Sequence, residues 1–396
     1  MFDKLAARIR ASDTNWRLLV PLLASTILVQ MVTALVRVTT SYRAVELNLS
    51  IVWLGIIAAT FTIFPILIAV RVGRHIDRGY DAQTTWLGAA IFAVACISFA
   101  AWSSPAGLLV GSTVMGIGHI MLMASQQMLC VRAASPRTME SVFGNYMVCG
   151  AIGQGIGPYV VGWVGGAAAV PPTRLLFMIG AVLAIVSLAV VLTMRPRRDR
   201  PAEISQSDVV PVGQLLRLPG LASIIAAGIV LIASSDIIVI YVPLLGAERN
   251  IDVHDIGLLL TMRAAASMVA RMIYARTVTA FGRWPLMIVS TFVYAASYAA
   301  FAAPLPLWAM HVAIATMGFS FGFAATLTIT ITVGLSSGAQ GTANSIRIMG
   351  NRVGQFVLPF TAGFVAAATG LAGLFLLLAA AVGAAAAAMA WKRPAA

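Results

Sequence analysis

Charged residues are scarce in this chain. Only 10% of its 396 residues are Asp, Glu, Lys or Arg, whereas soluble globular domains carry roughly 25%. Hydrophobic residues make up 60% of the sequence, and the mean hydropathy is +0.94. These values exclude a soluble fold for most of the chain, and they make lipid its expected solvent.

Acidic residues are half as frequent as basic ones. The sequence has 13 Asp and Glu against 26 Lys and Arg, which gives a formal net charge of +13. An excess of this size can indicate a nucleic-acid partner. Here the basic residues are separated by long apolar runs instead of forming a patch on a soluble fold, so we expect no nucleic acid to bind.

Cysteine is also rare, and motifs of catalysis are lacking. Cys96, Cys130 and Cys149 all lie in apolar stretches without metal-ligand spacing, so we expect buried apolar side chains and no metal site. The sequence has no phosphate-binding loop and no plausible pair of nucleophile and base. We therefore expect neither an enzyme nor a cofactor. The polar, basic start of the sequence does not resemble a cleavable signal peptide.

Apolar runs dominate what remains. A helix needs roughly 20 apolar residues to cross a bilayer, and only helices or closed barrels can span one. The runs are about twice as long as a barrel strand and do not alternate, so helices are predicted. The runs lie at about 17–40, 51–72, 83–103, 105–133, 138–165, 172–195, 219–245, 254–278, 284–302, 306–334, 340–368 and 370–391.

This spacing predicts an all-α integral membrane protein with twelve transmembrane helices in two related six-helix bundles. We expect an N-terminal bundle at 1–195, a cytoplasmic linker at 196–218 and a C-terminal bundle at 219–396.

The distribution of basic residues predicts the orientation. If both termini are cytoplasmic, nearly all Lys and Arg outside the spans lie on the cytoplasmic side, and the outer loops hold only Arg43, Arg174 and Arg249. Cytoplasmic loops carry such an excess in membrane proteins. We therefore expect a multi-pass protein of the inner (plasma) membrane, with its basic ends near anionic lipid.

An internal repeat links the two halves at an offset of about 202 residues. The segment from Gly153 to Val164 matches the segment from Gly354 to Val365, and AVELNLS after the first span matches GAERNID after the seventh. Further matched pairs are Glu46 with Glu248, Asn48 with Asn250, Leu54-Gly55 with Ile256-Gly257, and Met115-Gly116 with Met317-Gly318. Many secondary transporters consist of repeated halves with the substrate site between them near the midplane.

The loop after the second span carries the sequence GRHIDRGYD. Gly73, Asp77, Arg78 and Gly79 resemble the signature loop of the major facilitator superfamily. The resemblance implies that Asp77 latches the cytoplasmic side shut, either at the N-terminus of the eleventh helix or by pairing with Arg132. A solvated loop carboxylate is the alternative. Tyr80 and Asp81 replace the basic pair that ends the family motif.

The fifth predicted span is rich in glycine. Gly153, Gly157, Pro158 and Gly162 resemble the glycine-rich motif of antiporters in this superfamily, which implies export. Ordinary close packing of small residues is the alternative. In two respects the sequence departs from the family's drug/proton antiporters: Ser112 replaces an Arg in the fourth span, and the first span has no acid.

Ionisable residues inside a membrane are candidates for function. Asp236 is the only acid well inside a predicted span. It could carry a coupled proton, or be a fixed partner of Arg37 or Arg263. His119 in the fourth span could also carry a proton, although a hydrogen-bonded packing role is an alternative.

Two arginines, Arg263 and Arg352, lie near mid-depth in the eighth and eleventh predicted spans. Asn351 and Gln355 form a polar stripe beside Arg352. The planar guanidinium binds carboxylates in a fork, and the layout resembles that of organic-anion carriers of the family, such as oxalate/formate exchangers. We expect these residues, with Arg37 and Gln30 of the first span, to bind substrate. Caps on backbone carbonyls or pairing with Asp236 are the alternatives.

These features favour proton-coupled export of a small organic solute by alternating access, with an anionic or amphipathic substrate. The expected partners are that solute, protons and the lipid bilayer, and the expected state is a monomer. Uptake or exchange of a small carboxylate is the first alternative, and a membrane sensor or scaffold that transports nothing is a remote one.

Overall fold

The computed structural model describes residues 14–102, 104–135, 138–194, 212–336 and 340–391, and within these ranges the chain forms helices and no strand. The first group comprises α2 (Trp16–Glu46), α3 (Ile51–His75), a short π-helical segment η1 (Ile76–Tyr80), α4 (Asp81–Ala101), α5 (Pro105–Ala133), α6 (Met139–Gly165) and α7 (Thr173–Leu192). The second comprises α8 (Val212–Leu215), α9 (Leu221–Glu248), α10 (Val253–Phe281), α11 (Arg283–Ala302), α12 (Leu307–Leu335) and α13 (Gln340–Trp391).

Eleven of the described helices are long and apolar enough to cross a membrane. The longest of them, α13, has 52 residues and is broken at Gly370, where φ is 72° and lies outside the helical region. This break divides α13 into 340–369 and 371–391, each long enough to span a bilayer. The described chain therefore has twelve spans, and the predicted fold class is confirmed.

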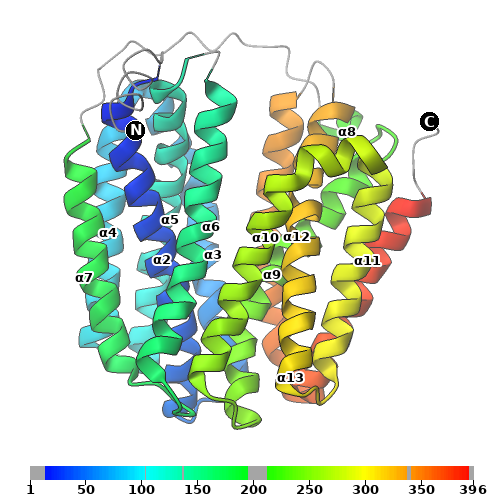
Figure 1. Ribbon diagram of the computed structural model, residues 1–396. Coiled ribbons are helices and arrows are strands. Elements are labelled where there is room, and N and C mark those ends of the chain that lie inside the picture. The colour runs from blue at the N-terminus through cyan, green and yellow to red at the C-terminus, as the bar shows by residue number, and fades with distance from the viewer. Residues whose placement is uncertain (1–13, 103, 136–137, 195–211, 337–339, 392–396) are drawn as a thin grey trace, which may run out of the picture.

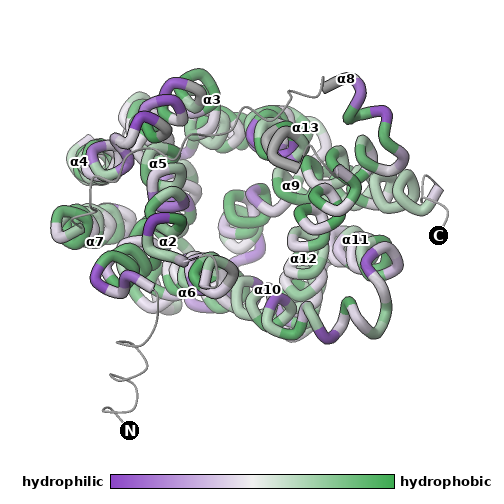
Figure 2. The backbone as a smooth tube through the Cα atoms, turned by 90° about the horizontal axis from the view of Figure 1, so that it is seen from above, coloured by the Kyte–Doolittle hydropathy of each residue, from purple (hydrophilic) through white to green (hydrophobic). Residues whose placement is uncertain are grey.

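The spans form two bundles, α2–α7 and α9–α13 (Figure 1). Within them α2 packs against α6 and α7, and α9 packs against α13. The bundles meet along two edges, where α6 lies beside α10 and α3 lies beside α13 (Figure 2). Most of the predicted linker at 196–218 lies outside the described residues, so the predicted domain boundaries stay a prediction.

At the ends of α2 and α9, two asparagines matched by the internal repeat adopt the same unusual backbone conformation. Asn48 and Asn250 have φ of 53° and 54° and are the only described residues other than glycine with positive φ. The next amide closes each helix in the same way: Leu49 donates to Ala44 O and Ile251 to Gly246 O, both at 2.9 Å. Asparagine tolerates this left-handed conformation better than most residues, which explains why both halves carry it.

We expect Asn48→Val to lower stability through the backbone alone, because the Asn48 side chain is exposed and the left-handed conformation costs other residues about 1–2 kcal/mol. Asn48→Gly is the matched control, since glycine adopts positive φ freely. Thermal unfolding of the purified protein in detergent should show a lower Tm for valine than for glycine. Equal Tm values for the two variants would contradict this account.

One end of the molecule is sealed by two equivalent helix crossings. We call it the sealed end; it is the end where α2 stops and α3 begins. A methyl group on Gly257 of α10 would lie 2.7 Å from the Cα of Gly162 on α6. A methyl group on Gly363 of α13 would lie 3.4 Å from the Cα of Gly55 on α3. Each glycine therefore meets, in the other bundle, a glycine that the repeat does not match with it: Gly162 meets Gly257, and Gly55 meets Gly363.

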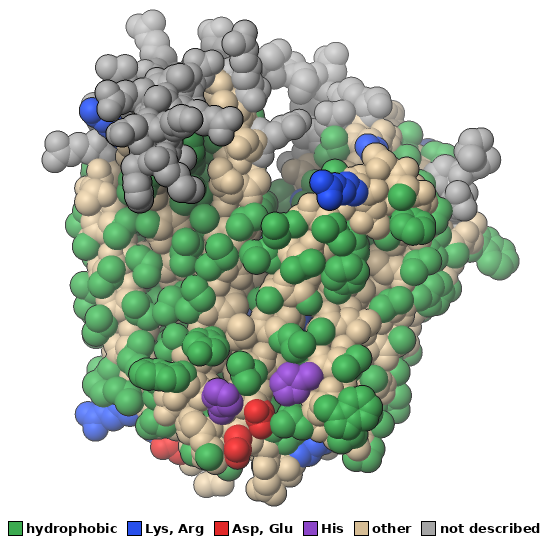
Figure 3. Space-filling view, in the orientation of Figure 1, with side chains coloured by type: hydrophobic (Ala, Val, Ile, Leu, Met, Phe, Trp, Pro, Cys, Tyr) green, Lys and Arg blue, Asp and Glu red, His purple; other side chains and the backbone are tan. Residues whose placement is uncertain are grey.

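Backbone hydrogen bonds also join the bundles at the sealed end. Val253 donates to Ala168 O and His254 donates to Gly166 O, each at 3.0 Å. At the opposite end, which carries the start of α2 and the end of α13, the molecule is hollowed between the bundles (Figure 3). The described part of the molecule is therefore open at this end and closed at the sealed end.

Candidate functional site

Asp236 lies at the centre of a polar chain that joins the two bundles. The Nη1 atom of Arg37 on α2 lies 3.0 Å from Oδ1 of Asp236 on α9. Gln355 on α13 donates from Nε2 to Oδ2 of Asp236 at 3.0 Å, and Arg352 donates to Oε1 of Gln355 at 3.3 Å. Of the partners that the sequence left open for Asp236, Arg37 is the one in contact.

Arg263 is held apart from that carboxylate. It is 9% exposed, and its Nη1 donates to the hydroxyl of Ser235 at 2.9 Å. Its Nε has no hydrogen-bond partner among the described residues. A guanidinium desolvated in this way is electrostatically unsatisfied, so Arg263 is a strong candidate for binding an anion.

A tyrosine pair supports the segment that carries Ser235 and Asp236. The hydroxyl of Tyr298 on α11 donates to Ser234 O at 2.6 Å, and the hydroxyl of Tyr294 lies 3.1 Å from that of Tyr298. Both tyrosines are fully buried. This pair was not predicted from the sequence, although two tyrosines four residues apart in an apolar span are a visible signal.

His119 on α5 also borders the polar centre. Its ring centroid lies 5.4 Å from that of Phe61 on α3, and its Nε2 has no partner among the described residues. Arg37 and Arg352 are near enough to interact electrostatically with it. His119 is therefore placed to offer a hydrogen-bonding nitrogen at the polar centre.

The remaining predicted polar residues take different positions. Asn351 Oδ1 is buried without a partner among the described residues. Gln30 donates to the sulfur of Met123 at 3.2 Å, so it contacts α5. Arg347, a further arginine of α13, is 8% exposed and donates to Oδ1 of Asn344 at 2.9 and 3.1 Å.

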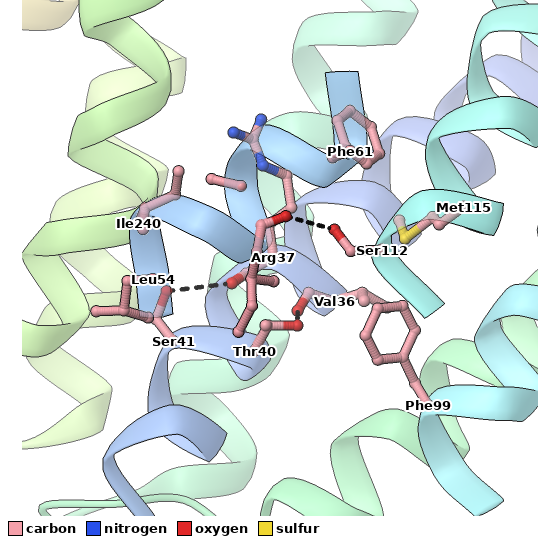
Figure 4. A pocket seen from close by; sticks show the side chains of 12 residues that line it. Val36, Arg37, Thr40, Ser41, Leu54, Phe61, Phe99, Ser112, Met115 and Ile240 are labelled. Carbon is pink, nitrogen blue, oxygen red and sulfur yellow. Dashed lines mark hydrogen bonds between the residues drawn. The ribbon is translucent and has the colours of Figure 1, made fainter. Parts of the chain in front are cut away.

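A small pocket lies beside Arg37 toward the sealed end (Figure 4). The hydroxyl groups that line this pocket already donate to backbone carbonyls. Thr40 donates to Val36 O at 2.7 Å, and Ser112 donates to Ile57 O at 2.9 Å. The rest of its lining is largely apolar. Ser112, which replaces the family's arginine, thus fastens α5 to α3 and does not present a free polar group.

The signature loop is only partly described. Gly79 has φ of 87°, a left-handed conformation that favours glycine, and Arg78 is exposed. The side chain of Asp77 lies outside the described residues, so its predicted latch is not tested. Nε of Arg132 contacts Oδ2 of Asp81 at 2.5 Å. This pair of α5 with the start of α4 was not predicted.

The glycine-rich motif of α6 brings backbones together. Methyl groups on Gly153 and Gly157 would lie 2.9 Å and 2.8 Å from the amides of Met31 and Leu35 on α2. Pro158 offers its carbonyl oxygen 2.7 Å from a methyl group on Gly257. The motif therefore packs α6 against its own bundle along one stretch and against the other bundle near the sealed end. Gly73 of the signature loop has open space around it.

Comparison with known proteins agrees with this architecture. No curated protein sequence matches the chain. Among solved structures, similar folds include the nucleoside transporter NupG (TM-score 0.74, 16% identity, covering 96% of this chain and 100% of that one). A POT family transporter in complex with 5-aminolevulinic acid has a TM-score of 0.80 at 11% identity, covering 95% and 96%. The inward-open xylose transporter XylE from E. coli has a TM-score of 0.74 at 14% identity, covering 95% and 94%.

At these identities the likeness concerns the fold alone. The sequence itself matches the family model of the Major Facilitator Superfamily over residues 22–250 and 224–396, which together span nearly the whole chain. With the twelve spans and the two bundles, this match identifies a multi-pass membrane transporter rather than an enzyme: the chain belongs to the major facilitator superfamily.

Proposed function

We propose that this transporter exports a small organic anion and couples the movement to protons. The observation that carries the proposal is the charge balance between the bundles. Arg37 pairs with the carboxylate of Asp236, Arg352 bonds the Gln355 that also holds it, and Arg263 bonds the adjacent Ser235. Charges at membrane depth are costly unless paired, so a carboxylate on the substrate would relieve the remaining positive field.

The direction of transport is supported by further arginines toward the open end. Arg271 follows Arg263 by about two turns of α10 and is near enough to interact with it electrostatically. Arg347 on α13 adds another arginine, which is buried. The basic residues of the sequence favour a cytoplasmic location for this end. A cationic route from the cytoplasm would concentrate organic anions at the site, as loading for export requires.

Proton coupling is supported by the position of Asp236 between the bundles. Arg37 belongs to α2 and Asp236 to α9, so their ion pair links the two halves. A proton on the carboxylate would remove its charge and weaken the link, which frees the halves to move. Binding of a proton at this position would therefore alter the conformational equilibrium, as coupling demands.

Uptake of labelled carboxylates, organic cations and neutral amphiphiles into proteoliposomes, with and without a pH gradient, tests the proposal. We expect wild type to carry carboxylates and Arg263→Gln to reduce that transport about tenfold or more, because loss of a charge-assisted contact worth about 1.5–3 kcal/mol is sufficient. Arg276→Gln is the matched control, since Arg276 lies exposed on the same helix. Transport of cations or neutral compounds that is indifferent to Arg263→Gln would refute an anion site.

A further inference from the structure

The same helix crossing occurs in both bundles, but the side chain at the crossing differs between them. A methyl group on Gly116 of α5 would lie 2.9 Å from the carbonyl carbon of Phe61 on α3. A methyl group on Gly318 of α12 would lie 2.8 Å from the carbonyl carbon of Arg263 on α10. Gly116 and Gly318 are matched by the repeat, and Phe61 precedes Arg263 by the same offset. Phe61 and Arg263 are therefore structural equivalents in opposite bundles.

This equivalence makes the central site asymmetric. In the first bundle the crossing carries an aromatic ring, with the guanidinium carbon of Arg37 5.5 Å from its centroid and the ring of His119 5.4 Å away. In the second bundle it carries a guanidinium bonded to Ser235. One wall of the site, at Phe61, thus offers aromatic surface beside Arg37. The other wall, at Arg263, offers positive charge beside Ser235, the neighbour of the Asp236 that pairs with Arg37.

Both walls also hold an unsatisfied polar atom. Nε of Arg263 and Nε2 of His119 have no partner among the described residues, and each side chain is 9% exposed. Buried polar groups are normally hydrogen-bonded. A ligand between the walls could supply both partners, with an acceptor for Arg263 and a small polar substituent for His119.

We propose, resting on the anion transport proposed above, that the substrate is an aromatic carboxylate. Its carboxylate pairs with Arg263, and its ring packs against the aromatic wall of Phe61 and His119. Aromatic rings prefer offset or edge-to-face packing, which a flat ring can adopt here and a saturated ring of similar size cannot match. Phe61 then selects for an aromatic ring in the substrate, and Arg263 selects for a negative charge on it.

Three carboxylates of equal charge test the inference in proteoliposomes that contain the full chain: benzoate, cyclohexanecarboxylate and butyrate. We expect wild type to transport benzoate at least about tenfold better than the other two, which corresponds to about 1.4 kcal/mol. Phe61→Leu should remove this preference while keeping cyclohexanecarboxylate transport, which also demonstrates that the variant folds. Phe61→Tyr should retain the preference.

The outcomes distinguish a failure of the aromatic substrate from a failure of the proposed anion site. If the saturated and aromatic acids are carried equally well, and Phe61→Leu changes nothing, the aromatic substrate is wrong while the anion site stands. If none of these acids, nor any other carboxylate in the wider panel, depends on Arg263, the anion site and the aromatic substrate both fail. The wild-type preference alone decides the point if Phe61→Leu does not fold.

Discussion

Gly162→Leu is expected to abolish transport by preventing closure of the sealed end. Gly162 crosses Gly257 so closely that a methyl group on Gly162 would lie 3.0 Å from the carbonyl oxygen of His254 and 3.1 Å from the Cα of Gly257. Both neighbours are backbone atoms, which cannot rotate away as a side chain could. Overpacking a tight contact costs about 1–3 kcal/mol, which shifts the equilibrium about fivefold to 150-fold toward states that open this end.

The measurement combines substrate uptake with accessibility. In a cysteine-free background, Ser41→Cys places a thiol in the small pocket at the sealed end, where Ser41 is 1% exposed. Gly162→Leu should accelerate its reaction with a membrane-impermeant reagent added from outside. Gly144→Leu is the control on the same helix, because no atom lies within 4 Å of a methyl group there. If both variants transport normally, the glycine crossing is not required for closure.

Asp236→Asn is expected to abolish the response to a pH gradient while exchange of substrate continues. The amide keeps the size of the side chain but cannot bind or release a proton at physiological pH. It also leaves Arg37 without its counter-charge. Because both side chains of the pair are only 18–19% exposed, removing the partner should cost about 1–3 kcal/mol, less than at a fully buried site.

Arg37→Gln separates the two consequences of this change. It breaks the same ion pair but leaves the carboxylate able to titrate, so a pH response should persist in altered form. Uptake driven by an imposed gradient and exchange at equal pH are measured side by side for both variants. A normal gradient response in Asp236→Asn would assign proton coupling to another group, such as His119.

Local sequence patterns predicted the spans well. Hydropathy is a property of each segment alone, and the apolar runs at 340–368 and 370–391 even located the break that the structure places at Gly370. The repeat also found the pairs Gly55 with Gly257 and Gly162 with Gly363. It did not reveal that Gly162 contacts Gly257 and Gly55 contacts Gly363. A sequence repeat indicates which residues are equivalent, and not which residues touch.

The partners of charged side chains were harder to predict. Asp236 had two plausible arginines, and the choice of Arg37 depends on how α2 approaches α9, which no local pattern encodes. The pair of Asp81 with Arg132 was overlooked because Asp81 stood out only as a departure from the family loop. Ser112 was noted for the same reason, and its bond to Ile57 O depends on the spacing of α3 and α5.

The location of the glycine crossings sets the amplitude of the motion that the molecule can make. Gly162 lies close to one end of α6, and the helix starts at Met139, so about 35 Å of helix extends beyond the contact at 1.5 Å per residue. If the bundles turn about this contact, α6 acts as a lever with a short arm and a long one. A rotation of about 10° would carry the far end through about 6 Å, with almost no displacement at the fulcrum.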